Sequence, residues 1–149
     1  MVTNKRVVLS SDHAAIEMRK KVTEHVLALG WVAVDIGPIT PESTHYPQHG
    51  VAAAELVASE DCQFGIILCG TGQGIMMAAN KVKGVRCGVC SDLFSAEMIR
   101  AHNNANMLAL GARVINELEA LQIVDVFLNT EFEGGRHGKR VDMIDALDV

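Results

Sequence analysis

Short apolar runs alternate with longer amphipathic segments along the chain, and this alternation limits the possible folds more than any other feature of the sequence. The apolar runs predict strands at 6–11, 32–37, 64–70, 85–90 and 106–111. The intervening patterns predict helices at 14–30, 48–59, 74–82, 92–103 and 115–129, with a last short helix opened by the glycine-rich turn 133–140. Continuously apolar strands separated by helices are typical of a parallel sheet that is covered on both faces.

We therefore expect an α/β protein, a three-layer Rossmann-like sandwich with a five-stranded parallel sheet and helices on both faces. The 149 residues, 49% of them hydrophobic, suit one domain with a single core over residues 1–149. The formal charge of −5 argues against nucleic acid as a partner. No apolar run is long enough to span a membrane, and the N-terminus lacks a signal-peptide core. Four cysteines in this length do not predict a disulfide framework, so we expect a cytoplasmic protein with reduced thiols.

The stretch CGTGQG, residues 69–74, follows the third predicted strand and precedes a helix. It is neither the G-x-G-x-x-G dinucleotide motif nor a P-loop, because the spacing differs and no Gly-Lys-Ser/Thr follows. The stretch could be a tight turn without a ligand, or an anion site made of backbone N–H groups. Cys69 favours the second interpretation, since a helix N-terminus stabilises a thiolate. A thiolate beside an anion site suits acyl transfer by a nucleophilic cysteine, or proton abstraction next to a carbonyl.

Other candidate ligands are polar residues at the ends of predicted elements, and those that follow a strand lie where ligands bind in parallel sheets. Asp12 could cap the next helix, and His13 could bind an anion or remain a surface residue. His102 and Asn103 come at a predicted helix end, where a histidine could simply interact with the helix dipole.

Three arginines indicate a small anionic substrate, because arginine binds phosphate with two parallel hydrogen bonds. Arg113 follows the fifth predicted strand, and Arg136 and Arg140 are four residues apart, on one face if that segment is helical. A solvated basic turn is the other interpretation of Arg136 and Arg140.

The two cysteines of CGVC, Cys87 and Cys90, resemble a redox or zinc motif only superficially. They lie in a strand pattern, where positions i and i+3 point to opposite faces, and no second cysteine pair is present. We expect them to be buried structural thiols. No set of residues with metal-ligand spacing is apparent, so neither a metal nor an organic cofactor is expected.

Taken together, these motifs resemble the ribose-5-phosphate isomerase B family of sugar-phosphate isomerases over nearly the whole chain. The resemblance is carried by SDHAA, by Tyr46-Pro47, and by CGTGQGIMMAANK, RAHNNAN, GARV and EGGRHGKRV. It implies that Cys69 is the base that moves a proton between C1 and C2 of the open-chain sugar. Thr71 and the loop of Gly70, Gly72 and Gly74 would stabilise the enediolate, and His102 would assist opening of the furanose ring.

The resemblance also assigns the substrate ligands. Asp12, Tyr46 and Asn103 would hold sugar oxygens, and the phosphate ligands would be His13, Arg113, Arg136 and Arg140. One branch of the family uses a glutamate just after the glycine loop as its base. This chain has Ile75 there, which leaves Cys69 as the candidate.

Two residues depart from the family pattern, which usually has an acid where this chain has His45 and often has glycine where it has Ser10. Both are expected near the sugar pocket, so they leave the substrate open. Ribose 5-phosphate is the first expectation, followed by a six-carbon aldose phosphate such as allose or galactose 6-phosphate, and then a free aldose. A sugar-phosphate-binding module without catalysis, or a cysteine hydrolase, remains as an alternative.

The expected topology separates Cys69 from His102. Cys69 ends the third strand, whereas His102 ends a helix that runs back over about 16 Å towards the other end of the sheet. We therefore expect a homodimer with shared active sites, in which His102 enters the partner's site, or a tetramer built from such dimers.

Overall fold

The computed structural model describes residues 2–148 and contains one sheet of five strands. The strands are β1 (Arg6–Ser11), β2 (Val32–Asp35), β3 (Phe64–Cys69), β4 (Cys87–Val89) and β5 (Met107–Gly111). Their order across the sheet is β2-β1-β3-β5-β4, and every neighbouring pair is parallel. The predicted five-stranded parallel sheet is confirmed.

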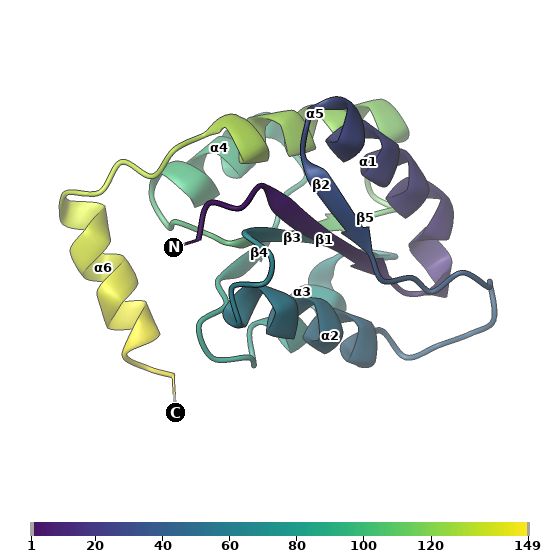
Figure 1. Cartoon of the computed structure of the whole chain (residues 1–149), viewed down its shortest axis with the longest axis horizontal. Coiled ribbons are helices and arrows are strands. Elements are labelled where there is room, and N and C mark those ends of the chain that lie inside the picture. Colours follow the sequence, from purple (N-terminus) through teal and green to yellow (C-terminus); the bar gives the residue numbers. More distant parts are fainter. Residues whose placement is uncertain (1, 149) are drawn as a thin grey trace.

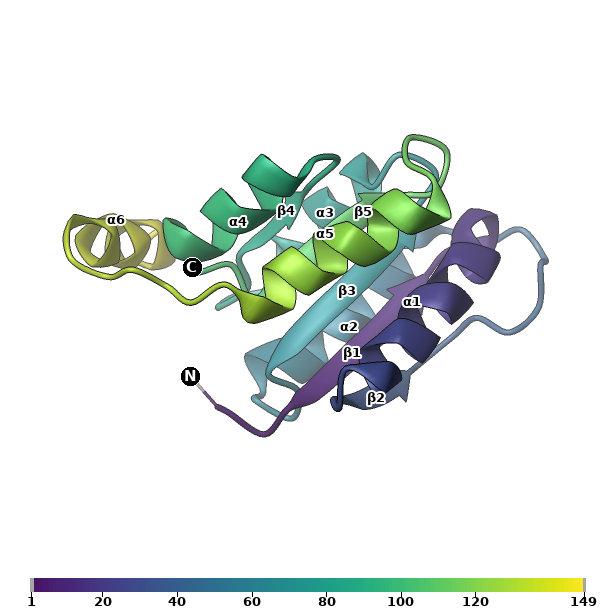
Figure 2. The ribbon, with the colours of Figure 1, turned by 90° about the horizontal axis from the view of Figure 1, so that it is seen from above.

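Helices cover both faces of this sheet, as predicted for a three-layer sandwich. The helices are α1 (Ile16–Ala28), α2 (Tyr46–Ala58), α3 (Gln73–Ala79), α4 (Leu93–Ala101), α5 (Glu117–Asn129) and α6 (Arg136–Asp145), with a 3₁₀ turn η1 (His13–Ala15) before α1. Helices α1, α4 and α5 lie on one face, and α2 and α3 lie on the other (Figures 1 and 2). No helix among residues 2–148 combines the length and the apolar character needed to cross a membrane.

Among the element boundaries that differ from those expected, three bear on the candidate site residues. Helix α2 begins at Tyr46, because Pro47 occupies the first turn, where its missing N–H costs nothing. Helix α4 ends at Ala101, so that His102 is its C-cap and Asn103 lies beyond it. The glycine-rich segment contributes directly to α6, which begins at Arg136 and contains both Arg136 and Arg140.

The sheet separates two apolar cores. One contains Val22, Phe64, Leu108 and Phe127 under α1, α4 and α5, and the other contains Ile67 and Ile75 among its residues under α2 and α3.

The two cysteines of CGVC lie on opposite sides of the sheet. Cys87 packs in the core under α2 and α3, and Cys90 packs in the core under α1, α4 and α5. All four cysteines are free and buried. Burial raises the pKa of the Cys90 thiol to about 11, and burial also raises that of Cys87. Cys87 and Cys90 are therefore structural thiols, as predicted.

Helix α6 stands apart from the sandwich at one end of the molecule (Figures 1 and 2). Only His137 and Val141 of this helix are buried, whereas Met143 and Ile144 are exposed by 62% and 47%. An amphipathic helix normally buries its apolar stripe against another surface. Most of the apolar side chains of α6 are thus available to a surface outside this chain.

Buried Arg19 joins α1 to the carboxyl ends of β1 and β2. Its guanidinium donates hydrogen bonds to Ser11 Oγ at 2.7 Å and to the Pro38 carbonyl at 2.6 Å. Its Nε lies 3.1 Å from Asp35 Oδ1, close enough for an ion pair although the N–H is not aligned for a hydrogen bond. Arg19 therefore fixes the segment that presents Asp12 and His13.

Replacing Arg19 with Met should lower the free energy of unfolding by about 3 kcal/mol, because buried hydrogen-bond acceptors and a carboxylate lose their partner. Urea denaturation measures this change. Lys20→Met is the matched control on the same helix, where the side chain is half exposed, and it should change stability by less than about 0.5 kcal/mol. A loss below about 1 kcal/mol for Arg19→Met would show that the cation does not stabilise this corner.

Candidate active site

The loops after β3 and β5 are joined by backbone contacts at the carboxyl end of the sheet. The N–H groups of Ala112 and Arg113 each donate, at 2.9 Å, to the carbonyls of Cys69 and Gly70 respectively. A Cβ on Gly111 would lie 2.6 Å from the Thr71 carbonyl oxygen, so only glycine leaves room for this approach. These contacts fix Cys69, Thr71 and Arg113 relative to one another.

The glycine loop then wraps around the Cys69 thiol. The Gly72 N–H donates to Cys69 Sγ at 3.1 Å, and the Gln73 N–H donates to Thr71 Oγ1 at 3.2 Å. Gly72 has φ of +80°, and a Cβ there would lie 2.8 Å from Val89, so both backbone conformation and space require glycine. Cys69 is thus 5% exposed, and its sulfur accepts a hydrogen bond from the backbone of the glycine loop.

Three further predicted site residues lie around this loop. The Tyr46 ring, at the start of α2, covers Gly74 so closely that a Cβ on Gly74 would lie 2.5 Å from it. Asp12 is bonded to β3 through its N–H and the Leu68 carbonyl, and its Oδ1 caps η1 by accepting from the Ala14 N–H. His13 Nδ1 accepts from the Thr44 N–H at 3.1 Å, which leaves Nε2 to carry the proton of a neutral ring.

The two departures from the family pattern have different surroundings. Ser10 is completely buried, and its hydroxyl donates to the His49 carbonyl at 3.0 Å. Ser10 therefore joins β1 to α2, and its hydroxyl is used within the protein. His45 is the exposed N-cap residue of α2.

Sequence reasoning missed His49, which lies one turn along α2 from Tyr46. Its ring hydrogen-bonds Thr44 Oγ1 at 3.0 Å, so it fixes the loop that also contacts His13. Burial lowers the pKa of His49, while Asp12 opposes this shift. A single histidine in the first turns of a helix gives no sequence signal. Only the packing of α2 against the 40–45 loop places His49 beside Thr44.

A second group of predicted site residues lies at the other end of the molecule. His102 is the C-cap of α4, and its ring stacks on that of His137 at the start of α6, with centroids 4.1 Å apart. Arg136 and Arg140 are exposed on α6. The Glu133 N–H donates to the Ala101 carbonyl at 3.0 Å and ties the α5–α6 segment to α4. We call this the His102 group, and Cys69 with the residues around its loop the Cys69 group.

Asn103 also lies at this end of the molecule. It lines a groove of about 420 Å³ together with Val85, Ile99 and Leu147.

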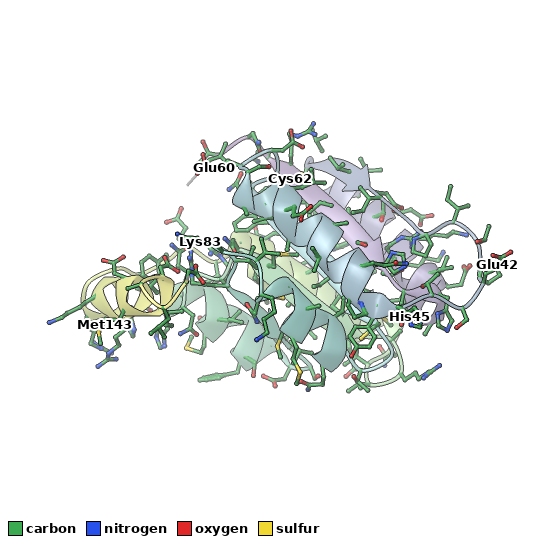
Figure 3. All side chains as sticks on the ribbon, turned by 90° about the horizontal axis from the view of Figure 1, so that it is seen from below. Glu42, His45, Glu60, Cys62, Lys83 and Met143 are labelled. Atoms are coloured by element: carbon green, nitrogen blue, oxygen red, sulfur yellow. The ribbon has the colours of Figure 1, made fainter. Side chains whose placement is uncertain are left out.

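The two groups are separated by the length of the sheet. Cys69 pairs with Gly111 at the carboxyl end of β5, whereas His102 comes shortly before Met107, where β5 begins. The five residues of β5 alone span about 13 Å at 3.3 Å per step. In Figure 3, Met143 of α6 and His45, which precedes α2, lie at opposite ends of the molecule. One chain therefore brings Arg113 to the Cys69 group and does not bring Arg136 or Arg140 there.

The His102 group also contains possible metal ligands that the sequence analysis did not recognise. Among residues 2–148, ligand atoms of His102, Glu133 and His137 all lie within 4.8 Å of one another. Burial and then the neighbouring His102 lower the pKa of His137. Glu133 lies in the irregular segment before α6 and His137 lies in the first turn of that helix, so their four-residue spacing alone does not predict that they meet.

The fold and the Cys69 group define a class of protein, an α/β protein with a buried thiol and a glycine-rich loop at the carboxyl end of its parallel sheet. The sequence profile of the ribose/galactose isomerase family matches residues 7–144. Ribose-5-phosphate isomerase B of Escherichia coli is 39% identical over 144 residues, which cover 97% of each chain. The chain therefore belongs to the ribose/galactose isomerase family.

Solved structures agree with this assignment. Ribose-5-phosphate isomerase B of Clostridium thermocellum has a TM-score of 0.94 and 43% identity, and the match covers 95% of this chain and 96% of that one. The enzyme of the same name from Mycoplasma genitalium, solved with bound ribulose 5-phosphate, has a TM-score of 0.91 and 38% identity, with 95% and 94% covered. The predicted family and fold are confirmed.

Gly111→Ala should destabilise the protein by about 1–3 kcal/mol and disturb the Thr71 backbone, because the added methyl group meets a carbonyl that cannot rotate away. Urea denaturation and amide hydrogen exchange of the 70–74 loop measure the two effects. Gly138→Ala is the matched control, since a Cβ at this position of α6 meets nothing within 4 Å. Equal stability of the two variants would contradict the close junction of the two loops.

Proposed function

We propose that this protein interconverts ribose 5-phosphate and ribulose 5-phosphate through an enediolate, with Cys69 as the base. The observation that carries the proposal is the Cys69 thiol against the glycine loop, in a chain whose relatives are named ribose-5-phosphate isomerase B. The thiolate removes the C2 proton of the open-chain aldose, and the C2–H electron pair forms the C1–C2 double bond of the enediolate. The carbonyl electrons move to O1, where backbone N–H groups of the 70–74 loop stabilise the charge.

The second half of the reaction returns the proton to the neighbouring carbon. A proton moves from O2 to O1, with the Thr71 hydroxyl beside both oxygens. The Cys69 thiol then protonates C1, and the electron pair on O2 forms the C2 carbonyl of the ketose. One thiol serves both carbons, so the step needs no oxidant, metal or organic cofactor.

We further propose that the functional unit is a dimer in which the His102 group of one chain completes the Cys69 group of the other. Three observations support this assembly: the separation of the two groups, the position of α6 outside the sandwich, and exposed apolar residues such as Phe94 and Met77. The partner's His102 would assist ring opening, and the partner's Asn103 would hold a sugar oxygen. Asp12 and Tyr46 would bind the other sugar oxygens.

The phosphate would then meet cations from both chains. His13 and Arg113 would come from one chain, and Arg136 and Arg140 from the α6 of the other. A dianion surrounded in this way is held by charge-assisted hydrogen bonds, which are shorter and stronger than neutral ones.

A screen of aldoses for ketose formation tests this function. We expect ribose 5-phosphate to give the highest kcat/KM, ahead of allose 6-phosphate, galactose 6-phosphate and free aldoses. Fastest turnover of a six-carbon phosphate would reassign the substrate. Binding of sugar phosphates without any ketose would indicate a binding module. A hydrolase is disfavoured, because no imidazole or carboxylate among residues 2–148 is hydrogen-bonded to Cys69 Sγ.

Cys69→Ala should lower kcat by ~10²–10⁴-fold while the protein still binds a phosphorylated sugar acid, because proton transfer is lost and the ligands remain. Steady-state kinetics and calorimetry measure the two properties. Cys62→Ala, which removes another buried thiol, is the control and should keep kcat. Near-wild-type turnover of Cys69→Ala would rule out Cys69 as the base.

Arg136→Ala should raise KM for phosphorylated sugars by about tenfold or more, since a hydrogen bond to a charged group contributes about 1.5–3 kcal/mol. Free sugars should be affected much less. Lys139→Ala, which removes an exposed cation from the same helix, should leave both values unchanged. A similar loss for phosphorylated and free sugars would assign Arg136 a structural role instead.

A further inference from the structure

Three side chains from different segments meet in the His102 group. His102 comes from the end of α4, Glu133 from the α5–α6 segment, and His137 from the first turn of α6. Glu133 Oε2 lies 3.7 Å from His102 Nε2 and 3.6 Å from His137 Nε2. The carboxylate thus lies beside both ring nitrogens.

The Nε2 atom of His137 is buried and has no hydrogen-bond partner among residues 2–148. The His137 side chain is only 8% exposed, and the 3.6 Å to Glu133 is too long for a hydrogen bond. A buried polar atom without a partner is unfavourable, and native proteins rarely contain one without a reason. Since it lies 3.6 Å from the Glu133 carboxylate, an ion bound between the two would give this nitrogen a partner.

The donor set is that of a zinc-class ion. Two imidazoles and one carboxylate form the protein ligands of several zinc sites that keep a fourth position open. Bonds of about 2.0 Å at tetrahedral angles place ligand atoms about 3.3 Å apart. The two distances to Glu133, 3.6 Å and 3.7 Å, need a contraction of a few tenths of an ångström, whereas the separation of the two histidine nitrogens is bounded only at 4.8 Å.

The stacked rings require one rearrangement. They are nearly parallel, with an interplanar angle of 8°, so their nitrogen lone pairs do not converge. His137 is fixed by burial, whereas His102 is 36% exposed at a helix end and has room to turn. Arg136 and Arg140 lie close enough to His137 to act on its charge. They repel a cation, so binding should be weaker than at a structural zinc site.

We propose that His102, Glu133 and His137 bind a divalent transition-metal ion of the zinc class. Each chain then has one site, with His102 turned out of its stack on His137. This site is separate from the chemistry of Cys69, which needs no metal. A further consequence, which rests on the proposed function, is that the bound ion inhibits the isomerase by taking His102 away from the sugar.

Titration of chelator-treated full-length protein with Zn²⁺ alone tests the site directly. Equilibrium dialysis should give one bound ion per chain, and binding should weaken at least tenfold in Glu133→Gln and His137→Gln. Glu133→Gln is nearly isosteric at a half-exposed position, so it keeps the test valid if His137→Gln unfolds α6. His25→Gln, which removes an imidazole paired with Asp125 elsewhere, is the matched control and should bind like the wild type.

Two results would overturn the site. The first is unchanged zinc binding in Glu133→Gln, and the second is loss of binding in Cys69→Ala, which would make the thiol a ligand instead. Inhibition is measured against each variant's own metal-free rate, and Glu133→Gln should need at least tenfold more Zn²⁺ than the wild type. Equal sensitivity would contradict the inhibitory role. A protein that binds zinc as expected but isomerises no sugar would refute the proposed function and leave the metal site standing.

Discussion

The close junction of the β3 and β5 loops is the constraint on which the rest of the site depends. Two backbone hydrogen bonds join these loops, and Gly111 allows the Thr71 backbone to approach where any side chain would collide. Because the junction fixes the start of the glycine loop, it also fixes the N–H group that contacts the Cys69 sulfur. The position of the thiol and of its backbone donor is thus set by the strand register and by the missing Cβ of Gly111.

The parallel sheet also explains why the candidate site residues lie in two separate groups. All five strands have their carboxyl ends on the same side, and the Cys69 group lies there. Each helix returns the chain to the amino ends of the strands, where α4 ends at His102. Helix α6 adds Arg136 and Arg140 at this amino end of the sheet, and its Met143 and Ile144 are exposed. In the proposed dimer a second chain would bring the two groups together, and a two-fold axis would do so at two sites at once.

Sequence patterns were sufficient for the sheet, the sandwich, the opposite-facing Cys87 and Cys90, and the family. Apolar periodicity encodes the strands, the helices and the facing of the two cysteines locally, and short motifs such as CGTGQG indicate the family. Contacts between distant segments are not encoded in this way. The burial of Ser10, the place of His49 beside His13, and the meeting of Glu133 with His102 and His137 depend on packing between elements. The start of α2 at Tyr46 was missed because Tyr-Pro resembles a loop, although proline suits a first helical turn.

Complementation between two inactive chains tests the shared site most directly. Cys69→Ala and His102→Ala chains, carrying different tags, are co-expressed, and the mixed dimers are purified through both tags. A mixed dimer has one site that lacks both groups and one intact site, so its activity on ribose 5-phosphate should recover towards half the wild-type value. Mixed dimers no more active than either parent would mean that His102 and Cys69 do not act across two chains.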